Sequence, residues 1–113
     1  MGSRQVFTAA AGLVLVAGLL GSGAAGAAGP SRADVLVKAT YLPPSVDVAT
    51  CGKVVWTFDD GDTPHTVTAD DDSFGSPSNG QKSGTFEHVF TTPGSVRYHC
   101  DFHPHMVGIV NVH

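Results

Sequence analysis

The chain has 113 residues, of which 42% are hydrophobic and 14% charged, and its formal net charge is −4 with neutral histidines. This length suits one small domain with a modest core. Ten acidic residues outnumber six Lys and Arg, and nucleic-acid binding is excluded because neutralising phosphates needs clustered cations.

The N-terminal part has the pattern of a secretory signal peptide. Arg4 precedes an apolar run over residues 6–20, and the small residues 25–27 form a cleavage signal of the A-x-A kind. An uncleaved membrane anchor is the alternative, but the run is shorter than the roughly 20 apolar residues that a spanning helix needs. We therefore predict a signal peptide over residues 1–27 and a domain over residues 28–113. The domain would lie in the periplasm or outside the cell, with no membrane-spanning segment after cleavage.

Short stretches rich in Val, Thr, Phe and Tyr follow residue 30 and alternate with Gly, Pro, Asn and Asp. This pattern is typical of strands in an antiparallel sandwich or barrel, and no helical period of useful length accompanies it. The predicted strands are 33–38, 45–48, 53–58, 65–69, 84–90, 95–99 and 107–112. Segment 70–83 could hold a short helix or an additional strand. The sequence thus predicts an all-β domain of about seven to eight strands.

A group of soft metal donors lies just before the last predicted strand. Cys100, His103 and Met106 supply a thiolate, an imidazole and a thioether within seven residues. This set suits copper, and Cu(I) in particular, better than Mg²⁺ or Ca²⁺. A trigonal copper site needs a second histidine from elsewhere in the chain. His65 is the best candidate, because it begins a strand at the end of the fold where strand 53–58 finishes.

The second cysteine, Cys51, is an alternative partner for Cys100, since two cysteines in an exported chain ordinarily pair. Strand 53–58 separates Cys51 from His65 by about 20 Å, at roughly 3.3 Å per residue. Bridged cysteines need Cα atoms within about 7 Å of each other. We therefore expect Cys51 to be a free thiol or to form only intermolecular bonds. A metal-free or zinc-bound module with a Cys51–Cys100 disulfide is the competing hypothesis.

Four segments of the chain form a recognisable pattern: Val-Val-Trp-Thr at 54–57, Pro-His-Thr-Val at 64–67, Thr-Pro-Gly at 92–94 and Tyr-His-Cys-x-x-His-x-x-Met at 98–106. In these segments the chain resembles the cupredoxins, and among them the plastocyanins and amicyanins. The similarity extends over nearly all of residues 33–112. It implies a Greek-key β-sandwich of two sheets, one mononuclear type 1 copper ion, and one-electron transfer between Cu(I) and Cu(II).

The resemblance also implies a role for each candidate ligand. His65 and His103 would supply imidazole nitrogens, Cys100 the short thiolate bond, and Met106 the long axial thioether. The protein would be a monomeric, exported electron carrier without enzymatic activity, and a redox protein partner would dock near His103. Copper delivery or copper buffering is the alternative function, because such proteins use similar soft donors.

Two residues depart from the family pattern. Thr66 follows the first histidine where the family usually has Asn, and Phe102 stands two residues after the cysteine where the family usually has Pro. We expect the hydroxyl and backbone N–H of Thr66 to replace part of the usual tie between the ligand loops. We also expect the backbone N–H of Phe102 to add a hydrogen-bond donor near the sulfur.

The remaining histidines have simpler interpretations. His88 shares one strand face with apolar residues, so it is expected to be a hydrogen-bonded core residue. His99 should point away from the metal site. His105 is expected at the surface, although it could replace His103 as a ligand. His113 is expected to be disordered, as terminal residues often are.

Overall fold

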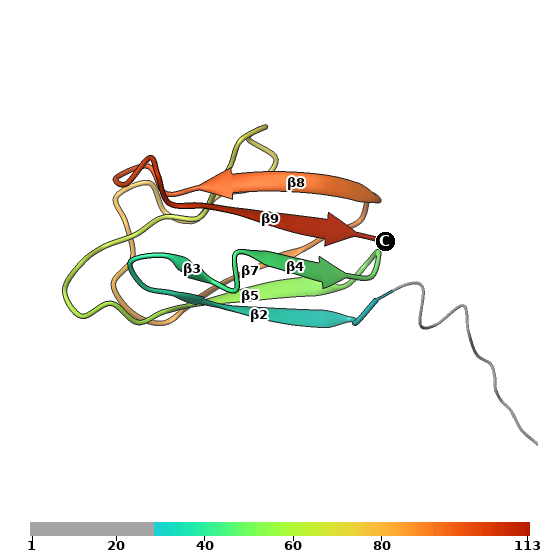
Figure 1. Cartoon of the computed structure of the whole chain (residues 1–113), viewed down its shortest axis with the longest axis horizontal. Helices are drawn as coiled ribbons and strands as arrows, with labels where there is room; N and C mark the ends of the chain where they lie inside the picture. Colours follow the sequence, from blue (N-terminus) through green and yellow to red (C-terminus); the bar gives the residue numbers. More distant parts are fainter. Residues whose placement is uncertain (1–28) are drawn as a thin grey trace, which may run out of the picture.

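The computed structural model describes residues 29–113, so the predicted signal peptide lies outside the described residues. Within this range the strands are β2 (Arg32–Val37), β3 (Tyr41–Leu42), β4 (Ser45–Val48), β5 (Lys53–Phe58), β6 (Thr68–Ala69), β7 (Thr85–Val89), β8 (Gly94–His99) and β9 (Val107–Val112). They form two four-stranded sheets with the orders β3-β2-β5-β7 and β4-β9-β8-β6, which lie as two layers in Figure 1. No helix in this part of the chain is long and apolar enough to cross a membrane.

The predicted Greek-key β-sandwich is confirmed, with one difference in strand direction. Strands β2 and β5 pair in parallel, as do β4 and β9, whereas the other pairs are antiparallel. Both sheets are therefore mixed, and the expectation of antiparallel sheets was wrong in this respect. The reason is the crossover between layers: the chain leaves β2, contributes β4 to the other sheet, and returns as β5 in the direction of β2.

The strand predicted at 65–69 is mostly loop, and only β6 remains of it. The backbone N–H groups that would have formed a ladder have other partners. The N–H of Thr66 donates to Cys100 Sγ at 3.4 Å, and the N–H of Val67 donates to Ser76 Oγ at 2.8 Å. The metal-site region thus uses backbone donors that a regular strand would have paired.

Segment 70–83 contains neither a helix nor a strand, and its main contribution to the core is Phe74. The Phe74 ring stacks on Trp56 with ring centroids 5.7 Å apart. Trp56 is fully buried, and it also packs against Phe86 at 5.6 Å and edge-on against Tyr98 at 5.4 Å. Each such side chain stabilises the fold by about 1.5–3 kcal/mol on burial, so this aromatic cluster anchors both sheets to each other.

Tyr98 also explains a glycine on the neighbouring strand. Tyr98 of β8 pairs with Gly108 of β9, and a Cβ at position 108 would lie 2.3 Å from Tyr98 Cζ. Only glycine leaves room for the ring, which is completely buried. Because Tyr98 lies two residues before Cys100, this packing fixes the strand that leads into the metal-site loop.

Candidate metal centre

The candidate donors lie on two loops at one end of the sandwich. His65 lies between β5 and β6, and its N–H and C=O both bond to the backbone of Gln81, at 3.1 and 2.9 Å. Cys100, His103 and Met106 lie on the loop between β8 and β9. That loop is closed by its own backbone, since Cys100 N–H donates to Met106 O at 3.1 Å and Met106 N–H donates to His103 O at 2.8 Å.

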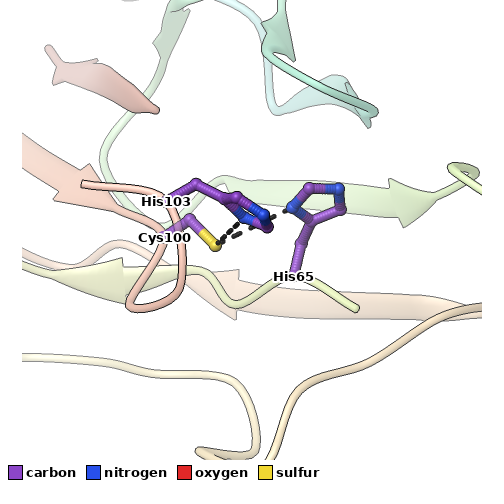
Figure 2. A group of neighbouring side chains, drawn as sticks. All are labelled: His65, Cys100 and His103. Atoms are coloured by element: carbon purple, nitrogen blue, oxygen red, sulfur yellow. Dashed lines mark hydrogen bonds between the residues drawn. The ribbon is translucent and has the colours of Figure 1, made fainter. Parts of the chain in front are cut away.

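The structure brings three of the predicted donors together. Ligand atoms of His65, Cys100 and His103 all lie within 4.8 Å of one another. Cys100 Sγ is 3.4 Å from His103 Nδ1 and 3.8 Å from His65 Nδ1, and Figure 2 shows both imidazole rings directed at the sulfur. Metal bonds of about 2.3 Å to sulfur and about 2.0 Å to nitrogen, at tetrahedral to trigonal angles, would separate such donors by about 3.5–3.7 Å. The donor spacing therefore fits a single metal ion.

Met106 is positioned with these three donors as in a type 1 copper site. Its side chain is 1% exposed and belongs to the core beneath the loop. A buried thioether beside a thiolate and two imidazoles is the donor set of a blue-copper site, and it does not resemble the oxygen-rich sites of Mg²⁺ or Ca²⁺.

The Thr66 tie between the two ligand loops is confirmed. In addition to its N–H bond to the sulfur, Thr66 accepts a hydrogen bond through Oγ1 from the backbone N–H of Asp101 at 2.8 Å. Tyr41 holds the other side of the same residue, because its hydroxyl donates to Thr66 O at 2.6 Å. A residue with a short hydroxyl side chain thus connects the His65 loop to the residue that follows Cys100.

The expectation for Phe102 was wrong. Among the described residues, the backbone donor to Cys100 Sγ is Thr66, and the N–H of Phe102 makes no hydrogen bond with the sulfur. The Phe102 ring instead reaches the loop beside His65, where a Cβ on Gly80 would lie 2.7 Å from the ring and 2.9 Å from Pro64 Cβ. Phe102 therefore contributes an exposed aromatic contact between loops, with 44% of its surface accessible.

Sequence reasoning missed one residue of the site, Asp60. Its Oδ2 lies 2.8 Å from Nε2 of His65, the ring nitrogen that faces away from the sulfur. No aspartate of this loop was among the site residues predicted from the sequence. The available signal was a carboxylate five residues before a candidate ligand, with Gly61 between them to allow the chain to turn at a φ of +59°.

His99 points away from the metal centre, as predicted. Its Nδ1 lies 2.5 Å from Asp70 Oδ1 and its Nε2 lies 3.1 Å from Asp101 Oδ1. The hydrogen bond with Asp70 is the main cause that raises the pKa of His99 above its ordinary value. His105 is exposed, and its ring centroid lies 6.4 Å from that of His103, so His103 and not His105 joins the donor cluster.

Two other histidine expectations need correction. His88 is half-buried and stacks on Phe74 with centroids 4.7 Å apart, but within the described chain its ring makes no hydrogen bond; burial lowers its pKa. His113 is not disordered. Its N–H donates to Val48 O at 2.9 Å, and its ring pairs with Asp47, because the last strand continues directly into it.

The expectation that Cys51 does not pair with Cys100 is confirmed. Both cysteines are unpaired, Cys51 exposed and Cys100 buried. Cys51 adopts a φ of 72° at the turn before β5, and its N–H donates to Phe90 O at 2.6 Å. His65 follows the other end of β5, so the two cysteines lie at opposite ends of the sandwich.

Comparison with known proteins gives matches among the solved structures. No protein-family profile and no curated protein sequence matches the chain. A purple cupredoxin from Nitrosopumilus maritimus is similar in structure with a TM-score of 0.65 and 30% identity, over 72% of this chain and 99% of that one. An oxidised plastocyanin from Dryopteris crassirhizoma has a TM-score of 0.64 and 20% identity, over 72% and 100% of the two chains. A Cu(I) form of an amicyanin variant has a TM-score of 0.63 and 27% identity, over 73% and 82%.

The two-sheet fold and the cluster of metal-donor residues together define a small β-sandwich metalloprotein. Its metal site lies at one end of the sandwich and consists of soft donors. The chain belongs to the cupredoxin family. The cofactor predicted from the sequence, one mononuclear type 1 copper ion, is thereby confirmed.

Proposed function

We propose that this protein is an exported blue-copper electron carrier that binds one copper ion through four ligands, His65, Cys100, His103 and Met106. The observation that carries the proposal is the convergence of three donor atoms within 4.8 Å at one end of a β-sandwich. When bound, the copper ion supplies a one-electron Cu(I)/Cu(II) couple. Membership of the cupredoxin family supports electron transfer as the general kind of function.

The chain's own contribution is to hold the donors in one arrangement. The hydrogen bonds that close the Cys100 loop, and those that link His65 to Gln81, involve only protein atoms. Thr66 then ties the two loops together. Donors fixed in this way move little when the oxidation state changes, and a small rearrangement makes electron exchange fast.

His103 is the best route for electrons between the site and a partner. His65 is 2% exposed and Cys100 is fully buried, whereas His103 is half-buried. The residues that flank His103 on its loop, Phe102 and Pro104, are exposed. We infer that a redox protein partner docks over this loop. A monomer suffices for this role, because one chain supplies all four ligands.

The burial of the site favours electron transfer over copper delivery. A delivery protein must release its metal to a partner, which requires ligands that the partner can reach. Three of the four proposed ligands, His65, Cys100 and Met106, are at most 2% exposed, so copper exchange through a partner's ligands would require opening of the loops.

A redox titration in the presence of a Cu(I) chelator tests the proposal. The copper-loaded protein should undergo repeated one-electron reduction and reoxidation while retaining its metal, and its visible band should recover fully in each cycle. Transfer of copper to the chelator at the first reduction, at a rate similar to that of the redox step, would overturn electron transfer and favour delivery.

A further inference from the structure

The two imidazoles that face Cys100 have different second partners. His65 Nε2 lies 2.8 Å from Asp60 Oδ2, with side-chain exposures of 3% for His65 and 33% for Asp60. In contrast, within residues 29–113, the only hydrogen-bond partner of the His103 ring is the Cys100 sulfur. One ligand therefore carries a built-in carboxylate contact and the other does not.

The contact determines which nitrogen of His65 carries the proton. An ionised carboxylate only accepts hydrogen bonds, so Nε2 of His65 is the protonated nitrogen and donates to Asp60. The unprotonated Nδ1 then faces Cys100 Sγ at 3.8 Å. The His65 side chain is almost completely buried, so water has little access to Nε2 and does not readily replace the carboxylate as its hydrogen-bond partner.

The loop is shaped to present Asp60 to the ring. The N–H of Thr63 donates to Asp60 O at 3.0 Å, and Gly61 lies in the left-handed region at a φ of +59°. These two features turn the chain back after β5. Lys38 holds the start of the turn, because its Nζ donates to Asp59 O at 3.0 Å. The Asp60 carboxylate thus has a fixed position and is not a freely moving surface charge.

We propose that Asp60 is a positioning residue of the metal centre, fixing the tautomer and ring orientation of His65 and stabilising Cu(II) relative to Cu(I). This inference rests on the proposed function. Carboxylate partners of ligating histidines orient the ring and increase its electron donation to the metal. A negative charge fixed behind the ring also favours the more positive oxidation state of the ion. Asp60 should therefore lower the reduction potential.

The test separates the hydrogen bond from the charge by using three variants. Asp60→Asn removes the charge and keeps an acceptor oxygen, whereas Asp60→Ala removes both. Asp62→Asn is the matched control, because Asp62 is exposed on the same loop and makes no hydrogen bond to His65 in the described structure. It reports the effect of losing one nearby charge without losing the contact.

Three measurements on the copper proteins give the outcome. In nitrogen-15 NMR spectra of the Cu(I) form, the proton on His65 Nε2 should exchange slowly with water in the wild type, Asp62→Asn and Asp60→Asn. In Asp60→Ala this proton should exchange rapidly, so that its signal is lost. Cu(II) affinity should fall by about 10- to 100-fold in Asp60→Ala and change little in Asp62→Asn. The midpoint potential should rise in both Asp60 variants by more than in Asp62→Asn.

Asp60 variants that match Asp62→Asn in affinity, potential and Nε2–H exchange would overturn the inference. That result differs from failure of the proposed function, in which the wild type itself would form no blue copper site. Asp60→Asn preserves the shape of the side chain, so it keeps the test informative even where Asp60→Ala disturbs folding of the loop.

Discussion

The backbone N–H of Thr66 donates a hydrogen bond to Cys100 Sγ at 3.4 Å across 34 residues of sequence. The two residues belong to different loops, one after β5 and the other after β8. The Thr66 hydroxyl accepts a hydrogen bond from the backbone N–H of Asp101. Thr66 therefore contacts both the sulfur of Cys100 and the backbone of the next residue. The metal-site geometry therefore depends on this contact as well as on the ligands.

Removing the Thr66 hydroxyl should weaken the connection between the loops. Thr66→Val keeps the branched shape and the backbone donor to sulfur, but it deprives Asp101 N–H of its acceptor. We expect the free energy of unfolding to fall by about 1 kcal/mol, the usual net value of one hydrogen bond. Denaturant unfolding of the copper-loaded protein measures this loss. Thr66→Ser retains the hydroxyl and is the control; equal stability of the two variants would contradict the assigned role.

Gly108 should tolerate no side chain. Gly108→Ala places a Cβ 2.3 Å from Tyr98 Cζ, and overpacking of this kind typically costs about 1–3 kcal/mol. Gly75→Ala is the matched control, since its nearest non-neighbouring atom, Val67 O, lies 4.0 Å from the added Cβ. Thermal unfolding should show a lower midpoint for Gly108→Ala alone. A Gly108→Ala protein as stable as the wild type would show that Tyr98 has room to move.

The two cysteines should differ in reactivity. In the folded, copper-loaded protein a thiol reagent should modify Cys51, which is exposed, and leave Cys100, which is buried, because access as well as thiolate character controls the reaction. Mass spectrometry after proteolysis assigns the modified site. Unfolding with a chelator should expose the second thiol. Detection of a Cys51–Cys100 disulfide in the native protein would contradict the fold.

The pH dependence of stability should contain a contribution from His99. Its hydrogen bond with Asp70 raises the pKa of His99 above 6.5 in the folded state. The protonated ring then stabilises the fold fully below about pH 6.5, and this contribution is lost as pH rises through the raised pKa. The difference in unfolding free energy between the wild type and His99→Gln should therefore be constant well below about pH 6.5 and shrink as the pH rises above that value. His105→Gln, which changes an exposed ring, should show no such trend; a pH-independent difference for His99→Gln would refute the assignment.

The local pattern of apolar and polar residues predicted most of the strands. The bounds expected for β4, β5 and β9 agree with the structure. In β4 and β9 buried residues alternate with more exposed ones, whereas β5 buries residues of both faces. The parallel pairing of β2 with β5 could not be predicted in this way, since it depends on which layer the intervening chain enters. The prediction of a strand at 65–69 was mostly wrong, because the N–H groups of Thr66 and Val67 donate to side chains and not to a neighbouring strand. The pattern of hydrophobic residues gives no information about such hydrogen bonds.

The donor cluster was predictable and its surroundings were only partly so. The spacing of Cys100, His103 and Met106 is itself a ligand pattern, and a strand of known length placed His65 at the same end of the fold. Asp60 was not predictable from spacing alone, because its contact with His65 requires the turn at Gly61. From the sequence, Phe102 was expected to supply a backbone donor near the sulfur, whereas the N–H that bonds to Cys100 Sγ belongs to Thr66 on the other loop.

The visible absorption spectrum of the Cu(II)-loaded protein, compared with that of Cys100→Ser, tests the central claim most directly. Charge transfer from a thiolate to Cu(II) in a constrained trigonal site gives an intense visible band, so the wild type should be strongly coloured. Cys100→Ser should lose that band while keeping the far-ultraviolet circular dichroism of the β-sandwich, because the strands are specified by their own alternation. A wild-type protein that binds Cu(II) without a strong visible band, or a Cys100→Ser protein that retains it, would contradict the account.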